Sequence, residues 1–274
     1  MVSKINCGIT GSSGILGSEF IKKKYFNFIK FRGNITNQKQ VDEWLRANRF
    51  DLIIHLAAIV PTHAVEKNYK KALEVNFKGT KYLIDAVLKN NINLKWFFFS
   101  STSHVYNFSN KKINEMSLTR PISKYGFTKL KAEKYIRNIL RNKKINYCIG
   151  RIFSFTHTNQ KSSFLIPSLK KKINQKNSKL IKFKNLNHYR DFISINDICN
   201  IIYFLWKKNF RGTINIASGQ KIYLKKIVNF LSKKYKKKTE FLDTNKKTSL
   251  IADTSKINSL GYKIKRMNIS NIIN

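Results

Sequence analysis

The sequence is short of acidic residues. It has 14 aspartate and glutamate residues against 54 lysine and arginine residues, which gives a formal net charge of +40. Dense positive charge is one mark of nucleic-acid binding, because it neutralises phosphates. Only 10 of the basic residues are arginine, however, the usual residue for paired contacts to phosphates and bases. We therefore interpret the charge as a compositional bias that also attracts anionic substrates, and not as a nucleic-acid site.

Cysteine, proline and glycine are also scarce, and apolar runs are short. Cys7, Cys148 and Cys199 are far apart and lack Cys/His ligand spacing, which argues against a disulfide framework and a metal site. Eleven glycines and three prolines, without low-complexity stretches, do not favour disorder. No apolar run approaches the roughly 20 residues that span a bilayer, and no signal peptide is visible. We therefore expect a cytoplasmic protein without membrane contact.

Strand-like and helix-like segments alternate through the first half of the chain. Apolar segments typical of buried strands lie at 5–10, 28–32, 51–56, 95–100 and 145–152. Segments with helical periodicity lie between them, at 14–25, 38–48, 78–89 and 123–142. Repeated βα order favours right-handed crossovers and a parallel sheet covered on both faces. The sequence therefore predicts an α/β fold with a Rossmann-type, doubly wound parallel sheet.

This regular alternation weakens after about residue 153. Helices are expected at 163–176, 196–207 and 222–235, and short strands at 179–183, 190–194, 213–217 and 239–242. We predict two parts, an N-terminal domain at 1–152 and a smaller C-terminal α+β lobe at 153–274. The elements of the second part are expected to interleave partly with the main sheet.

A glycine-rich turn, Gly11-Ser12-Ser13-Gly14-Ile15-Leu16-Gly17, follows the first strand. Gly11 permits a tight turn, Gly14 lets the backbone approach a pyrophosphate, and Gly17 lets helix and strand pack closely. The following helix offers free N–H groups to a phosphate. An ordinary tight turn has the same composition, but the position between a first strand and a helix favours dinucleotide binding.

The residues after the second strand bear on the choice between NAD and NADP. An NAD site usually has an acidic residue about 20 residues after the loop, which binds the ribose 2′-hydroxyl. This region contains no acid, and Lys30 or Arg32 can instead hold a 2′-phosphate. The alternative is that both are solvated residues of a very basic protein. NAD and NADP both stay open, and the basic pair favours NADP.

Tyr125 and Lys129 are four residues apart, one turn of helix. An apolar stripe through Ala132, Ile136 and Ile139 continues from them, so both side chains should face the sheet. A buried lysine is costly unless it has a partner or a task. An ammonium and a positive nicotinamide favour phenolate, which would pull the pKa of Tyr125 towards neutrality. The phenol can then exchange a proton with a substrate hydroxyl or carbonyl.

Hydroxyl groups end the strand at 95–100, in the run Ser100-Ser101-Thr102-Ser103-His104. Ligands of open α/β sheets bind at the carboxyl ends of the strands. A hydroxyl at this edge can therefore bind the same substrate oxygen as the phenol.

Taken together, these motifs resemble the extended short-chain dehydrogenases/reductases, in particular the NAD(P)-dependent nucleotide-sugar epimerase/dehydratase group, over nearly the whole chain. The shared residues are Thr10-Gly11-x-x-Gly14-x-x-Gly17, His55-Leu56-Ala57-Ala58, Asn76 with Gly79-Thr80, Ser100-Ser101-Thr102 with Val105-Tyr106, Tyr125-x-x-x-Lys129, Gly150-Arg151, Arg190-Asp191 with Asp197, and Asn215 with Ser218-Gly219. Eight modest motifs in the right order make coincidence a poor explanation. The resemblance implies an NAD(P)-binding Rossmann domain at 1–152 and a substrate-binding lobe at 153–274.

The resemblance also implies roles for individual residues. Thr102, Tyr125 and Lys129 would be catalytic, with Tyr125 as the acid/base and Lys129 on the nicotinamide ribose. Thr102, Tyr125 and Arg190 would bind the nucleotide sugar, with Arg190 on its diphosphate. Cofactor contacts are implied for Gly11, Ser13, Gly14, Ile15, Arg32, Asn34, Ile35, Leu56, Ala57, Ala58 and Lys129. The family commonly forms helix-paired homodimers, which are one expected assembly.

One departure from the family pattern narrows the chemistry. Dehydratases of this group usually carry an acid just after the catalytic Ser/Thr, whereas Ser103 and His104 stand there. Elimination is therefore disfavoured, and we interpret His104 as a packing or surface histidine. The leading hypothesis is a nucleotide-sugar epimerase or 4-keto reductase. The alternative is a non-catalytic NAD(P)-binding regulator or RNA-binding relative, which the charge favours and the intact set of Thr102, Tyr125 and Lys129 opposes.

Overall fold

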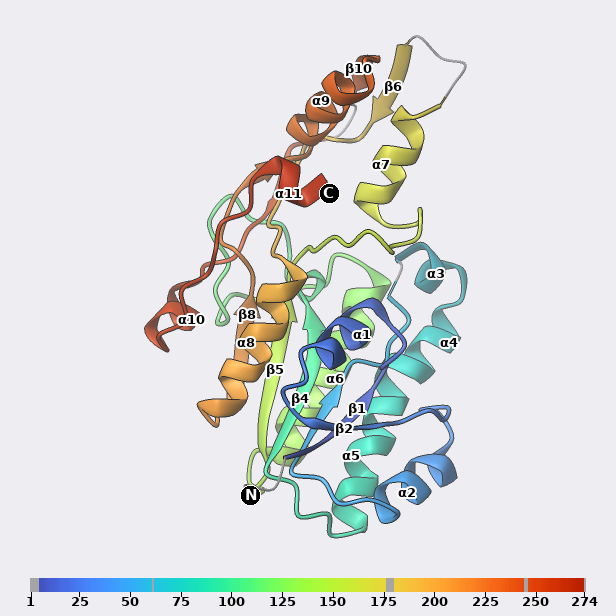
Figure 1. Cartoon of the computed structure of the whole chain (residues 1–274), viewed down its shortest axis with the longest axis vertical. Helices are drawn as coiled ribbons and strands as arrows, with labels where there is room; N and C mark the ends of the chain where they lie inside the picture. Colours follow the sequence, from blue (N-terminus) through green and yellow to red (C-terminus); the bar gives the residue numbers. More distant parts are fainter. Residues whose placement is uncertain (1–4, 61, 176–179, 244–245, 274) are drawn as a thin grey trace.

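A computed structural model describes residues 5–60, 62–175, 180–243 and 246–273. Its centre is a six-stranded parallel sheet with the strand order β2-β1-β3-β4-β5-β8 (Figure 1). The strands are β1 (Asn6–Thr10), β2 (Asn27–Lys30), β3 (Leu52–His55), β4 (Trp96–Thr102), β5 (Asn146–Ile152) and β8 (Gly212–Ile216). The chain order reverses between β1 and β3, and such a switch point opens a crevice at the carboxyl ends of the strands. The predicted α/β fold class is confirmed.

Helices cover both faces of this sheet. One face carries α1 (Ile15–Lys22) and α8 (Ile195–Lys207), and the other carries α2 (Gln38–Arg46), α5 (Gly79–Lys89) and α6 (Lys124–Leu140). Successive strand residues point to opposite faces. Within β4, therefore, Phe98 packs into the core beside α1 and α8, whereas Phe97 and Phe99 pack into the core beside α2, α5 and α6.

The C-terminal half builds a second layer of small elements on one end of the main sheet (Figure 1). They are α7 (Leu165–Ile173), β6 (Leu180–Lys184), β7 (His188–Arg190), β9 (Ile222–Tyr223), α9 (Leu224–Tyr235), β10 (Lys238–Leu242), β11 (Thr248–Leu250) and α11 (Ile269–Ile273). Strands β10 and β6 pair with each other, and β7 lies between β11 and β9. A separate apolar core, including Leu169, Phe183 and Leu231, holds this layer together. Three elements of this half, α8, β8 and α10 (Ser255–Ser259), lie instead in the main body (Figure 1).

Several predicted boundaries are wrong. The first helix ends at Lys22 and not at residue 25, because Lys24 takes a left-handed backbone conformation with φ of 54°. The strand predicted at 190–194 is β7 and ends at Arg190, where Asp191 turns towards hydrogen-bond donors outside the strand. Residues 176 and 179, included in two predicted elements, lie outside the described residues.

The connection between β3 and α5 was not predicted to be helical. It contains α3 (Thr62–Lys67), α4 (Tyr69–Leu73) and a π-helix, η1 (Glu74–Lys78), that runs directly into α5. Single-turn π-helices often occur at functional sites. Among the helices that the structure describes, none is long and apolar enough to cross a bilayer.

Candidate active site

The turn between β1 and α1 leaves no space for a side chain at two of its glycines. Gly11 has φ of +69°, and a Cβ added there would lie 2.6 Å from the backbone nitrogen of Ala57. A Cβ on Gly17 would lie 2.3 Å from the carbonyl oxygen of Gly11. Gly14 caps α1 without a side chain, so the first N–H groups of this helix face the turn. This backbone arrangement fits a pyrophosphate.

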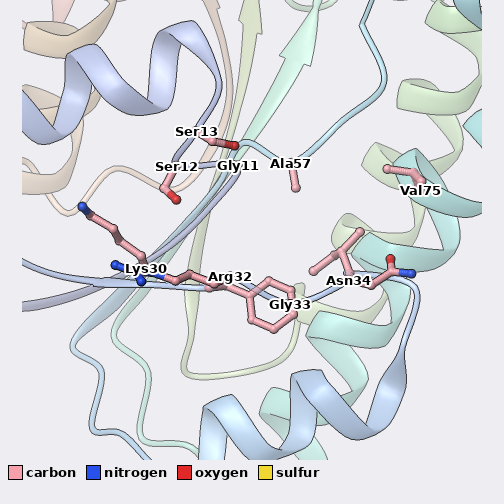
Figure 2. Close-up of a pocket in the computed structure, with 11 residues that line it drawn as sticks. Gly11, Ser12, Ser13, Lys30, Arg32, Gly33, Asn34, Ala57 and Val75 are labelled. Atoms are coloured by element: carbon pink, nitrogen blue, oxygen red, sulfur yellow. The ribbon is translucent and has the colours of Figure 1, made fainter.

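A pocket of about 600 Å³ lies beside this turn (Figure 2). It is lined by Gly11, Ser12, Ser13, Lys30, Phe31, Arg32, Gly33, Asn34, Ile35, Ala57 and Val75. Of the residues predicted to contact a cofactor, Gly11, Ser13, Arg32, Asn34, Ile35 and Ala57 line the pocket, whereas Gly14, Ile15, Leu56, Ala58 and Lys129 do not. Ser12, Phe31, Gly33 and Val75 were not predicted. Val75 lies on η1, the element that sequence periodicity did not show.

Lys30 and Arg32 supply the charge of this pocket, and none of its described lining residues is acidic. Both side chains are exposed and lie on the side of the pocket that carries Ser12 (Figure 2). Two cationic side chains close to a helix N-terminus make the pocket attractive for anions.

His55 is a fully buried anchor between strands and helix. Its Nδ1 lies 2.6 Å from Thr10 Oγ1, and its Nε2 lies 2.9 Å from Thr80 Oγ1. Burial, and secondarily the charge of Lys129, lowers the pKa of His55 to about 3. The imidazole is therefore neutral and joins β1 and β3 to α5.

Asn76, on the π-helix η1, fixes the segment that follows β3. Its Oδ1 accepts a hydrogen bond from the backbone N–H of Ile59 at 2.7 Å, and its Nδ2 donates to the carbonyl of Ile59 at 3.0 Å. The same Nδ2 donates to Thr128 Oγ1 on α6 at 3.0 Å. This side chain thereby holds the pocket segment around Ala57 at a fixed position relative to α6.

Thr102, Tyr125 and Lys129 lie at one edge of the main sheet. Thr102 ends β4, and α6 begins one residue before Tyr125. The Tyr125 phenol and the Thr102 side chain share a hydrogen bond. Lys129 is 1% exposed, and its Nζ lies 4.1 Å from the ring centre of Phe99. The structure thus brings together the three residues that the sequence singled out for catalysis.

The protein alone raises the pKa of Tyr125, whereas the predicted downward shift depended also on a positively charged nicotinamide. Burial raises the pKa of this phenol well above its ordinary value, and the hydrogen bond with Thr102 lowers it only partly. Burial also lowers the pKa of Lys129 to about 7, against the opposing effect of Glu133. Removal from water disfavours the charged form of both groups. Tyr125 is therefore protonated at neutral pH.

A buried ionic network lies behind these three residues, and the sequence analysis missed its centre. Glu133, one turn beyond Lys129, accepts hydrogen bonds from Arg151 Nη2 at 2.7 Å and Arg151 Nε at 3.0 Å. It also accepts from the hydroxyl of Ser101, which precedes Thr102. Arg151 donates further to Tyr106 Oη at 2.8 Å. The four-residue spacing from Lys129 was the available signal for Glu133.

Arg190 and its neighbour Asp191 have separate surroundings. The guanidinium of Arg190 lies 5.3 Å from the ring centre of Phe108, and burial lowers its pKa to about 10. Asp191 is fully buried and accepts hydrogen bonds from Ser218 N and Oγ at 2.8 and 2.7 Å, Gly219 N at 2.9 Å, and Ala252 N at 3.1 Å. Asp191 thus fixes the backbone that presents Arg190.

The segment after β4 pairs with a part of the chain about 140 residues away. The N–H of Ser109 donates to the carbonyl of Ser249 at 2.9 Å, and the N–H of Ile113 donates to the carbonyl of Ile251 at 2.8 Å. In return, the N–H of Asp253 donates to the carbonyl of Ile113 at 2.8 Å. Phe108, which packs on Arg190, is held within this paired segment.

His104, interpreted from the sequence as a packing or surface histidine, is half-buried beside the catalytic candidates. Its ring centre lies 5.9 Å from that of Tyr125, with the rings edge to face. Its Nδ1 lies 3.1 Å from the hydroxyl of Ser123, the N-cap of α6.

Comparisons with known proteins agree with this geometry. The profile of the NAD dependent epimerase/dehydratase family matches residues 8–217. A relative named GDP-6-deoxy-D-talose 4-dehydrogenase, from Aggregatibacter actinomycetemcomitans, is 30% identical over 221 residues, which cover 77% of this chain and 74% of the relative.

Two solved structures share the fold. RMD from Pseudomonas aeruginosa, complexed with NADPH, superposes with a TM-score of 0.86 at 18% identity, covering 98% of this chain and 96% of the other. UDP-glucose 4-epimerase from Thermus thermophilus, complexed with NAD, gives a TM-score of 0.85 at 15% identity, with coverage of 98% and 97%.

Proposed function

Because the chain belongs to the NAD dependent epimerase/dehydratase family, we propose that it is a nucleotide-sugar epimerase or 4-keto reductase that interconverts a sugar hydroxyl and a ketone. The observation that carries this proposal is the meeting of Thr102, Tyr125 and Lys129 at the sheet edge that also bears the glycine turn. A protein that only bound a dinucleotide would not need this set, so we do not adopt the regulatory or RNA-binding alternative.

The cofactor site is proposed at the pocket beside the glycine turn. Gly11 and Gly17 fit a pyrophosphate because a Cβ at either position would fill the turn. When bound, NAD(P) supplies the hydride acceptor or donor. Lys30 and Arg32 would hold a 2′-phosphate, and we therefore propose NADP in preference to NAD. Lys129 would bind the nicotinamide ribose.

Tyr125 is proposed to move the proton. Since burial keeps the phenol protonated, it is suited to donate a proton to a ketone oxygen as that carbon is reduced. Thr102 would hold the same oxygen through its hydroxyl. The protonated phenol is the form that a 4-keto reduction requires at its start. The name of the Aggregatibacter relative, a 4-dehydrogenase, supports chemistry at the same sugar position.

Elimination of water is disfavoured by the residues that follow Thr102. Ser103 is buried and His104 is a neutral imidazole, because burial and the charge of Arg190 lower its pKa to about 4. Neither residue is a carboxylate that could remove a carbon-bound proton as the leaving group departs. Redox chemistry at one carbon requires only the residues already assembled.

The nucleotide end of the substrate is proposed to lie against the C-terminal lobe, residues 153–274, opposite the cofactor-binding residues 1–152. Arg190, without a carboxylate partner among the described residues, would pair with the diphosphate. Asp191 would keep the guanidinium in place through its hydrogen bonds to residues 218, 219 and 252.

A homodimer is proposed through the outer face of α6 and the adjoining η1. Phe127 on α6 is 45% exposed, and Lys131 packs its ammonium 5.1 Å from the ring centre of Phe77. Exposed aromatic rings are enriched in protein interfaces. Light scattering of the wild type and a Phe127→Glu variant tests this assembly, which predicts a dimer that the variant weakens.

The decisive assay follows NAD(P)H absorbance with a panel of nucleotide 4-keto sugars and nucleotide hexoses. We expect turnover with at least one member and a loss of about 10²- to 10⁴-fold in kcat for Tyr125→Phe, the usual range for acid/base catalysis. Cofactor affinity should stay within about twofold, because the phenol does not provide the pyrophosphate site. Absence of turnover across the panel, or an unchanged kcat in the variant, would refute the mechanism.

A further inference from the structure

His104 lies near both residues proposed to meet the substrate, Tyr125 and Arg190. Its ring is in edge-to-face contact with Tyr125, at 5.9 Å between ring centres. Arg190 is close enough for its charge to add to the effect of burial in lowering the pKa of the imidazole. If Tyr125 meets the reacting sugar oxygen and Arg190 the diphosphate, the imidazole lies beside the hexose that joins them.

The backbone and ring of His104 are held from several directions. Its N–H donates to Thr102 Oγ1 at 3.2 Å, and its carbonyl accepts from the N–H of Ile122 at 3.2 Å. Its ring Nδ1 lies 3.1 Å from Ser123 Oγ. A Cβ added to Gly126 would lie 2.1 Å from the His104 carbonyl oxygen, so the start of α6 presses directly on this residue. The ring therefore has a fixed orientation.

The hydrogen bond to Ser123 occupies Nδ1, with the hydroxyl taken as the donor, and leaves Nε2 as the available ring nitrogen. The Ser123 hydroxyl accepts from the N–H of Gly126 at 3.1 Å as the N-cap of α6, and its own proton is free for Nδ1. With Nδ1 accepting, a neutral ring carries its proton on Nε2. Within the described part of the chain, Nε2 has no hydrogen-bond partner, and the residue is only half-buried.

We propose that His104 is a specificity-determining residue whose Nε2–H donates a hydrogen bond to a hydroxyl of the substrate hexose. This inference rests on the proposed function. It adds a contact that recognises the sugar and does not involve the nucleotide. A neutral donor matches a sugar hydroxyl, whereas the permanent cation Arg190 matches the diphosphate. The interpretation of His104 as a packing or surface residue is replaced by this role.

Three substitutions separate the Nε2 contact from the other effects of the residue. His104→Phe keeps a ring without nitrogen atoms. His104→Gln places an amide near the position of Nε2, whereas the shorter His104→Asn places one near Nδ1 only. Titration calorimetry with UDP-glucose, dTDP-glucose and GDP-mannose, each against UDP, dTDP or GDP alone, measures the contribution of the sugar. NADP⁺ is present throughout.

For the nucleotide sugar that the wild type binds, His104→Phe and His104→Asn should lose about 5- to 30-fold in affinity, the range of one hydrogen bond. Affinity for the corresponding nucleoside diphosphate should stay within about twofold, and His104→Gln should keep both. Equal losses for sugar and diphosphate, no loss in the Phe variant, or equal behaviour of Asn and Gln would overturn the proposal.

Controls distinguish a failure of the His104 proposal from a failure of the proposed function. If thermal unfolding shows that the Phe variant is misfolded, the comparison of Gln with Asn alone decides. If the wild type binds no nucleotide sugar and turns none over, the proposed function has failed. The His104 proposal fails on its own when the wild type binds the sugar and the Gln and Asn variants match it.

Discussion

Replacing Gly126 with alanine should separate Tyr125 from the strand that carries Thr102. A Cβ at residue 126 would lie 2.1 Å from the carbonyl oxygen of His104, and an ordinary contact begins near 3.4 Å. The backbones must therefore move apart by about 1.3 Å. A misplacement of about 1 Å at reacting groups costs on the order of 10²-fold in rate. We expect kcat/KM of Gly126→Ala to fall by about that factor.

The same change should also lower stability, against the usual direction. Glycine to alanine within a helix normally stabilises by about 1 kcal/mol, because it reduces the freedom of the unfolded chain. Overpacking costs about 1–3 kcal/mol, so the net loss should reach up to about 2 kcal/mol and the melting temperature should fall by a few degrees. A carbonyl oxygen in a packed backbone cannot rotate out of the way.

Gly79→Ala is the matched control. Its Cβ would first meet the side-chain Cγ2 of Ile35 at 2.8 Å, an atom that can move by a small rotation. Scanning calorimetry should therefore show a smaller fall in melting temperature for this variant than for Gly126→Ala. A Gly126→Ala protein with an unchanged or higher melting temperature, and with kcat/KM within about threefold of the wild type, would refute the reasoning.

Three further predictions concern the charged groups. Arg32→Glu should lower the ratio of kcat/KM for NADP to kcat/KM for NAD by about 10- to 100-fold, because it removes a charge-assisted hydrogen bond to the 2′-phosphate. Steady-state assays with both cofactors measure this ratio, and an unchanged ratio would contradict the prediction. The pKa of Lys129, lowered by burial to about 7, lies below its unfolded value, so its destabilising effect is full below pH 7 and disappears as pH rises towards 10. Lys129→Met should accordingly have a higher melting temperature than the wild type at pH 7, and this difference should disappear by pH 10. A difference in melting temperature that does not vary with pH would contradict the prediction. Glu133→Gln leaves the buried Arg151 without its carboxylate partner and should lower the free energy of unfolding in urea by about 3–5 kcal/mol. The control Glu66→Gln, in a half-exposed ion pair, should lower it by less than about 1 kcal/mol. Equal losses in the two variants would contradict a stabilising role of the buried Glu133–Arg151 pair.

Local patterns explain why the sequence predicts the main sheet and much of the site. Buried strands such as 51–56 and amphipathic helices such as 78–89 follow from periodicity within one segment. Tyr125 and Lys129 share a helix, and Thr102 ends the adjacent strand, so their proximity follows once a parallel sheet is accepted. Arg32, Asn34 and Ile35 follow β2, so their position at the carboxyl edge of the sheet also follows from a parallel sheet.

Features that depend on distant contacts were not predicted. The π-helix at 74–78 is stabilised through Asn76, whose partners lie at residues 59 and 128. In the sequence, Glu133 looks like an ordinary surface residue of a helix. Only the fold brings Arg151, on β5, into contact with it. The upward effect of burial on the pKa of Tyr125 was not predicted, because the sequence shows which groups are near, while the extent of burial is set by tertiary packing.

The pairing of residues 109–113 with residues 249–253 determines when, during synthesis, the substrate site can finish folding. A ribosome delivers the chain from the N-terminus at about 5–20 residues per second, and the early strands can pair as they emerge. The segment that carries Phe108 beneath Arg190, however, receives its backbone partners only after residue 253 has been made. A nascent chain can therefore hold its first strands and helices for several seconds while its substrate site is still open. Ribosome-bound chains stalled before residue 248 should resist proteolysis in β1 to β5 yet be cut within 107–117 faster than the completed protein, in which residues 109 and 113 are hydrogen-bonded to residues 249–253.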